Sequence, residues 1–113
     1  MKPAKLDLAN PDWLLAGFDE QHELFQFAKV SRQTYFSSSF LDHRIVPMPE
    51  QVLTATGAEV DAVLRGRKHP PGAMIFHTAF CASTLLASCL DHPSRTLVLR
   101  EPMVLTHLAR RVR

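Results

Sequence analysis

The chain has 113 residues, enough for one domain, and its 46% hydrophobic content is typical of a globular protein. A formal net charge of +2 is too small to indicate a nucleic-acid partner by itself. Three arginines lie close to the C-terminus, at Arg110, Arg111 and Arg113. We interpret them as a solvated helix end, where the helix dipole favours cations, rather than as a polycationic tail for an acidic partner.

The first residues lack the apolar run of a signal peptide, and no stretch approaches the ~18 apolar residues of a membrane span. We therefore predict a cytoplasmic protein with no membrane partner. The two cysteines, Cys81 and Cys89, would lie ~12 Å apart on one helix, which is beyond the reach of a disulfide. No group of His, Cys, Asp and Glu residues has the spacing of a zinc site, so no metal is expected.

Residues 1–72 are predicted to form a helical lead-in. After a polar arm, apolar residues recur near a period of 3.6, which predicts helices within residues 12–69. We expect a break at the serine-rich stretch 37–44 and a second helix from about Pro49 to Gly66. The aromatic residues of this half are predicted to be core rather than a base-stacking platform: Phe25, Phe27, Tyr35 and Phe36.

The pattern changes in residues 73–113. The predicted elements are a strand at 74–77, a loop at 78–82, a helix at 83–91, a strand at 96–99 and a helix at 102–112. Both strands are continuously apolar, as in parallel strands covered on both faces, and a strand–helix–strand order implies a right-handed crossover. The predicted fold class is therefore α/β: N-terminal helices followed by the first parallel βαβ unit of a P-loop sheet.

Two parallel strands do not make a stable sheet, because three or more strands are normally needed. We therefore expect the chain to be the N-terminal part of a larger α/β domain, or a truncated frame. In an isolated chain, the exposed edge of the strand at 96–99 is expected to promote self-association.

The stretch "HTAFCASTLL", residues 77–86, predicts a sharp turn from a strand into a helix. The first N–H groups of a helix have no internal partner and carry the positive end of its dipole, so an anion can bind there. Ser83 and Thr84 would add two hydroxyl donors. The alternative is that Ser83 only caps the helix, with no ligand. The residues of this helix expected to face the core are Leu85, Leu86, Cys89 and Leu90.

This segment resembles the P-loop of the sulfotransferase family, above all bacterial sulfotransferase-like proteins. Their strand, loop and helix read roughly aromatic-His-Thr-x-Arg-Cys-Gly-Ser-Thr-Leu-Leu. The matching residues are Phe76, His77, Thr78, Cys81, Ser83, Thr84, Leu85 and Leu86. The second predicted strand, the "REP" at 100–102, and Val104 with Leu105 also match, so the resemblance covers about residues 74–108. The nucleoside-triphosphatase pattern GxxxxGK[ST] is absent, which disfavours ATP hydrolysis and a kinase.

The resemblance implies a transferase that uses 3′-phosphoadenosine 5′-phosphosulfate as co-substrate and a small-molecule acceptor. It implies that the donor is bound by Thr78, Phe80, Cys81, Ala82, Ser83, Thr84 and Arg100. Sulfuryl transfer needs positioned cations, yet Phe80 stands at the family's basic position and Ala82 at its glycine. His77 is the candidate for the missing charge. The alternative function is a non-catalytic interaction module that retains the P-loop fold with a degenerate anion site.

Three of these residues also have structural interpretations. His77 at a strand end is commonly a hydrogen-bonded structural histidine. Arg100 would face the donor, or would pair with Glu101 or a helix terminus. Cys81 lies next to a helix N-terminus, which can lower a thiol pKa, but a packed thiol is the simpler interpretation.

Overall fold

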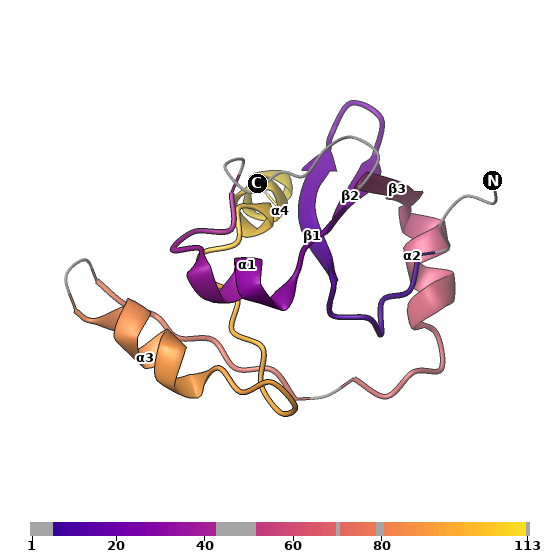
Figure 1. Cartoon of the computed structure of the whole chain (residues 1–113). Coiled ribbons are helices and arrows are strands. Elements are labelled where there is room, and N and C mark those ends of the chain that lie inside the picture. The colour runs from indigo at the N-terminus through magenta and orange to yellow at the C-terminus, as the bar shows by residue number, and fades with distance from the viewer. Residues whose placement is uncertain (1–5, 43–51, 70, 79–80, 113) are drawn as a thin grey trace.

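The computed structural model describes residues 6–42, 52–69, 71–78 and 81–112. Its elements in chain order are β1 (Trp13–Asp19), β2 (Leu24–Lys29), α1 (Arg32–Ser37), β3 (Val52–Thr56), α2 (Gly57–Leu64), α3 (Ser83–Leu90) and α4 (Val104–Arg111). The strands form one antiparallel sheet in the order β1-β2-β3 (Figure 1). The protein is therefore mixed α/β, which confirms the predicted class at that coarse level.

The predicted helix in the first part of 12–69 is wrong, because a β-hairpin of β1 and β2 takes its place. The turn between the strands explains the difference. The carboxylate of Asp19 accepts hydrogen bonds from the backbone N–H groups of Gln21 at 2.9 Å and His22 at 3.2 Å. Glu23 then adopts a left-handed φ of 54°. An Asp side chain that bonds its own backbone stabilises a tight turn, and the turn places the two apolar segments side by side.

A β-bulge between Leu15 and Gly17 marks the place where α4 meets the sheet. A Cβ atom at Gly17 would lie 3.0 Å from Oε1 of Gln26 and 3.4 Å from Nδ1 of His107. That ring nitrogen of His107 also accepts a hydrogen bond from the N–H of Phe18 at 3.4 Å. The glycine therefore allows a histidine of α4 to approach the backbone of β1 closely.

The predicted helix from Pro49 to Gly66 is only half correct. Its first residues lie outside the described ranges, and β3 takes the next five, so the helix α2 starts at Gly57. Thr56 is the N-cap, and it forms a capping box with Glu59: each side chain bonds the other residue's backbone N–H, at 3.3 and 2.7 Å. The helix ends at Leu64, and Gly66 follows with a φ of +76°, as a glycine after a helix end predicts.

The core lies on β1, β2 and α1. Its buried residues are Leu14, Ala28, Val30, Tyr35 and Leu41, with Ala16 and Leu97 packed against them. The core prediction is confirmed for Phe27 and Tyr35, each 3% exposed. It is wrong for Phe36, which is 48% exposed and whose ring lies 5.7 Å from the guanidinium carbon of Arg100.

The helix α4 confirms the prediction for residues 102–112, although it starts two residues later. Its end is bound to the hairpin by Arg111. The guanidinium of Arg111 lies 4.7 Å from the ring centroid of Phe18 and 3.0 Å from the carboxylate of Glu23. The charged helix end therefore contacts the sheet in addition to facing solvent.

The predicted strands at 74–77 and 96–99 are wrong. Within the described ranges, neither segment has a strand partner, and the only nearby ladder contact is an isolated bridge between His92 and Thr96. The sheet is antiparallel and lies elsewhere, so the described residues form no parallel βαβ unit. Backbone groups without a neighbouring strand form no ladder, however apolar their side chains. The expected strand edge at 96–99 is likewise not formed, and self-association stays a prediction.

Candidate functional site

The helix α3 begins at Ser83, as predicted. Ala82 holds the N-cap position, with φ 61° and ψ 25°, and it makes no side-chain capping bond. The first hydrogen bond of the helix runs from the N–H of Leu86 to the carbonyl of Ala82 at 3.1 Å. The backbone N–H groups of Ser83, Thr84 and Leu85 therefore have no partner within the helix. They form the positive end of its dipole.

The left-handed backbone at Ala82 gives a physical reason for the glycine that the resembled family has at this position. A Cβ atom in this conformation costs about 1 kcal/mol, whereas glycine adopts it freely. The left-handed turn is formed at Ala82 despite this strain. An alanine at this position therefore raises the free energy of the turn, but the backbone still turns into the helix as it would with glycine.

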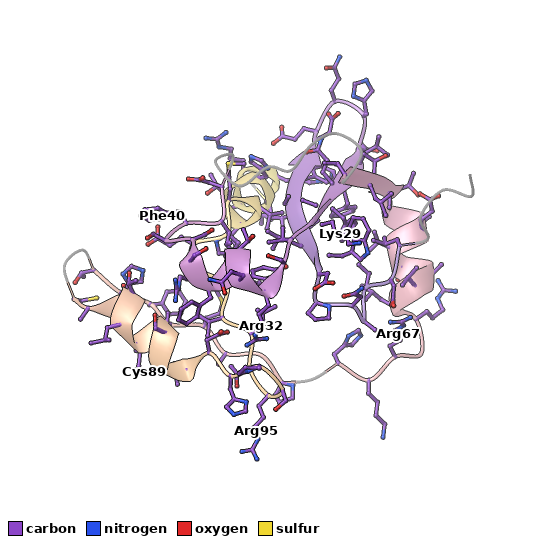
Figure 2. The ribbon with its side chains drawn as sticks, in the orientation of Figure 1. Lys29, Arg32, Phe40, Arg67, Cys89 and Arg95 are labelled. Atoms are coloured by element: carbon purple, nitrogen blue, oxygen red, sulfur yellow. The ribbon has the colours of Figure 1, made fainter. Side chains whose placement is uncertain are left out.

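The side chains around this turn are mostly exposed. Cys81 is an exposed free thiol, and Phe80 lies outside the described residues. The prediction that one face of α3 packs on the core is wrong: Leu85, Leu86, Cys89 and Leu90 are exposed, and Ala87 is the buried residue of the helix. Figure 1 shows the reason, because α3 lies apart from the sheet, and Figure 2 labels Cys89 on it.

His77 makes two contacts just before the turn. Its Nε2 lies 3.3 Å from the carboxylate of Glu101, and its Nδ1 lies 3.2 Å from the carbonyl oxygen of Thr78. Both partners are acceptors, so both contacts are satisfied only when the two ring nitrogens carry protons. Because the two side chains are partly exposed, the pair by itself adds little stability.

Arg100 of the "REP" stretch is buried, with 9% of its surface exposed. Its Nη1 donates to the carbonyl oxygens of Phe36 at 2.6 Å and Ser38 at 3.4 Å, and its Nη2 donates to the hydroxyl of Ser88 at 2.9 Å. Within the described structure, its Nε is buried without a partner. These contacts correspond to the helix-terminus alternative, since Arg100 binds the carbonyl end of α1 and connects it to α3.

A second arginine binds just beyond Ser88, at the C-cap of α3. Nη2 of Arg32 lies 2.9 Å from the carboxylate of Asp91 and donates to the carbonyl of Thr96 at 2.7 Å. The same carboxylate oxygen of Asp91 accepts the N–H of Val98 at 3.3 Å. Figure 2 shows Arg32 on α1, with Arg95 in the loop that follows α3. No local pattern could have revealed this site, because Arg32 and Asp91 are far apart in the sequence.

Among the described residues, the start of α3 therefore offers unpaired N–H groups to an anion, with the hydroxyl-bearing Ser83 and Thr84 in its first turn and His77 before the loop. The sequence has no lysine or arginine between His77 and Arg95 to add charge. Among the described residues, no group of three or more His, Cys, Asp and Glu side chains converges on a metal position, and no helix has the length and apolarity to cross a bilayer.

No protein-family model matches this chain, and no curated protein or solved structure matches it either. Its function has to be inferred from its own residues and their geometry.

Proposed function

We propose that residues 77–84 form the anion-binding loop of a sulfotransferase-like P-loop protein. The N–H groups and hydroxyls of Ser83 and Thr84 would bind the 5′-phosphosulfate of 3′-phosphoadenosine 5′-phosphosulfate. The observation that carries this proposal is the start of α3: the helix begins after a glycine-like turn at Ala82, and no side chain caps its N–H groups.

The contact between His77 and Glu101 also supports the proposal. It joins the two stretches on which the resemblance depends, the loop and "REP", through side chains 3.3 Å apart. The contact therefore places the end of the loop's lead-in segment beside the "REP" stretch in the present fold, without a parallel sheet between them in the described ranges.

The chemistry requires positive charge near the transferred group. In sulfuryl transfer, an acceptor hydroxyl or amine attacks the sulfur and loses its proton, while the bond from sulfur to the bridging phosphate oxygen breaks. Negative charge grows on that oxygen, which leaves as part of 3′-phosphoadenosine 5′-phosphate. We propose His77, which contacts the Glu101 carboxylate and the carbonyl of Thr78, as the side chain that acts on this charge together with the helix N-terminus.

Calorimetric titration with 3′-phosphoadenosine 5′-phosphate, the stable product of the donor, tests the site. Replacing both Ser83 and Thr84 by alanine should weaken binding by about tenfold or more, since two hydroxyl hydrogen bonds are lost. The matched control carries Ser94→Ala and Thr106→Ala, which remove the same groups at exposed positions outside the loop. Equal affinity of the two double variants, or no binding by the parent chain, would contradict the proposal.

The second candidate function is the non-catalytic interaction module. It is favoured by Arg100, whose guanidinium is occupied by backbone carbonyls rather than free for a ligand. The combined change Phe80→Arg and Ala82→Gly separates the two functions. A large gain in affinity for 3′-phosphoadenosine 5′-phosphate would support a degenerate site in the present chain. No gain, with micromolar binding by the parent chain, would support a working variant.

A further inference from the structure

A cavity of about 390 Å³, open to solvent on one side, lies between β1, α4 and the segments that flank them. Its walls are formed by residues from the loop before β1, the strand itself, α1, the segment 97–102 and α4. They are Leu8, Ala9, Asn10, Pro11, Trp13, Leu14, Leu15, Tyr35, Leu97, Leu99, Pro102, Val104, Leu105 and Leu108. This lining shares none of the described residues of the loop 77–84, so the cavity is treated apart from the candidate anion site.

Among the described residues, no charged side chain lines the cavity, and two of its polar side-chain atoms are occupied. The hydroxyl of Tyr35 donates to the carbonyl of Pro11 at 2.9 Å, and the side-chain oxygen of Asn10 accepts the N–H of Asp12 at 2.9 Å. Water molecules inside would find few of the two to four partners that an ordered water needs. A charged ligand would lose its hydration without gaining an opposite charge.

The side chain of Tyr35, which lines the cavity, lies in an environment of low polarity. Burial, with a smaller contribution from the charge of Asp12, raises the pKa of the Tyr35 phenol to about 12. Tyr35 also belongs to the core cluster, with Leu14 beside it in both the cluster and the lining. Two residues of the lining therefore belong to the hydrophobic core.

We propose that this cavity binds a small, neutral, apolar molecule, such as one built on an aromatic ring or a short alkyl chain. Its volume falls within the roughly 300–1,000 Å³ of small-molecule sites, which are mostly apolar with few polar groups. Displacing poorly bonded water from leucine side chains supplies the driving force. The inference goes beyond the proposed anion site and does not depend on it.

The indole of Trp13 reports on the cavity directly, because it is the only tryptophan of the chain and lines the cavity. The full chain is titrated with bromobenzene, whose heavy atom quenches indole fluorescence on contact. We expect saturable quenching, and binding at least about tenfold weaker for 4-bromobenzoate, which has the same ring and a charge. Quenching that rises linearly without saturation, or equal binding of the two probes, would overturn the proposal.

Two phenylalanine variants separate this cavity from general apolar adsorption. Leu105→Phe fills the cavity from α4 at a side chain that is 48% exposed, so the fold should tolerate it. Leu85→Phe makes the same change on α3, at an exposed position outside the lining. Only the first variant should weaken bromobenzene binding, by several-fold. Equal loss in both variants, or none in either, would overturn the proposal.

Leu99→Phe fills the cavity from a different wall and repeats the test if Leu105→Phe does not fold. A second copy of the chain is the competing occupant. It would make the Trp13 emission depend on protein concentration without any probe, and it would leave bromobenzene unbound. That combination would overturn the proposal, whereas saturable binding at every protein concentration would support it.

Discussion

The sheet with α4 and the region around α3 use equally apolar sequence in different ways. In β2, the stretch "LFQFAK" buries Phe27 and Ala28, whereas in α3 the stretch "STLLASCL" buries only Ala87 among its described residues. Leucine side chains of α3 remain exposed, and so is Phe76 before it. Apolar composition does not decide burial by itself. A segment is buried when another element offers a face to cover it.

The sheet obtains that face from nearby sequence. A hairpin needs only a short turn, and the Asp19 turn places β2 directly on β1. A parallel pair would instead need a crossover helix and further strands, and the described residues supply the helix α3 but no strand beside segments 74–77 and 96–99. The two regions therefore differ in whether a neighbouring strand is available for their apolar segments to pair with.

Polar contacts connect the α3 region to the rest of the molecule. Arg100 binds the end of α1 and the Ser88 hydroxyl, and Arg32 binds Asp91 and a backbone carbonyl beyond α3. Such contacts depend on direction and distance, whereas apolar packing tolerates small shifts. We therefore expect the sheet to respond to loss of volume and the α3 region to respond to loss of hydrogen bonds.

The largest expected effect comes from a matched pair of phenylalanine truncations. Phe27→Ala removes a ring that is 3% exposed and should lower the free energy of unfolding by about 3–5 kcal/mol. Phe76→Ala removes the same group at 87% exposure and should change it by no more than about 0.5 kcal/mol. Urea titration followed by circular dichroism measures both values. Similar losses of unfolding free energy in the two variants would mean that Phe76 is buried in solution, which would contradict the difference between the two regions.

Arg100→Met should lower the free energy of unfolding by about 2–3 kcal/mol, because hydrogen bonds from a charged donor are lost inside the molecule. The control is Arg95→Met, a change at an exposed arginine that Figure 2 shows in the loop after α3. Hydrogen exchange gives the regional readout: the amides of α3 should exchange faster in Arg100→Met. Unchanged protection of α3 would contradict the connection between this arginine and the helix.

Ala82→Gly should raise the free energy of unfolding by about 1 kcal/mol, since glycine adopts the φ of +61° without strain. The sign of this change in the free energy of unfolding is the test. Ala87→Gly, inside the same helix and buried, should lower it by about 1 kcal/mol or more. Denaturant titration of both variants is sufficient. Destabilisation by Ala82→Gly would mean that the left-handed turn is not formed in solution.

The smallest expected effect is a pH dependence in the sheet region. Hydrogen bonds from the backbone N–H of Thr56, and then from its hydroxyl, hold the pKa of Glu59 below its ordinary value of 4.5. The folded chain therefore binds this proton less readily than the unfolded chain. The resulting stabilisation is fully present above pH 4.5 and is lost as the pH falls through the lowered pKa.

Glu59→Gln should remove this component, so its deficit relative to the parent chain should be present at pH 7 and shrink in acid. The urea midpoint of each protein, measured from pH 7 down to pH 3, follows the deficit. Glu20→Gln, in the hairpin turn, is the charge-matched control and should show no such trend. A constant deficit across this pH range would contradict the capping bonds.

Several local features could be read from the sequence. The start of α3 at Ser83, the helix near residues 102–112 and the end of α2 near Gly66 follow from turn residues and apolar spacing. The capping box of Thr56 and Glu59 was also readable, as a threonine three residues before a glutamate. It marks the start of α2 after β3, whereas the apolar spacing of residues 49–66 alone favours one continuous helix.

The hairpin was not predicted, because the apolar residues of 13–29 fit a helical period as well as they fit strands. The site was partly foreseen. The sequence shows an alanine at the position where the resembled family has glycine, but only the structure shows that its backbone is left-handed. The partners of Arg100 lie on α1 and α3, so no spacing within one segment could indicate them.

The sequence by itself determined the short-range features: where helices begin and end, where turns form and which segments are apolar. These depend on hydrogen bonds and backbone preferences within a few residues. Only the tertiary structure decided which apolar segments are covered, that the sheet is antiparallel, and that Arg100 binds the end of α1. Those outcomes depend on contacts between residues far apart in the chain, and the free energy of each contact exists only once both partners are in place.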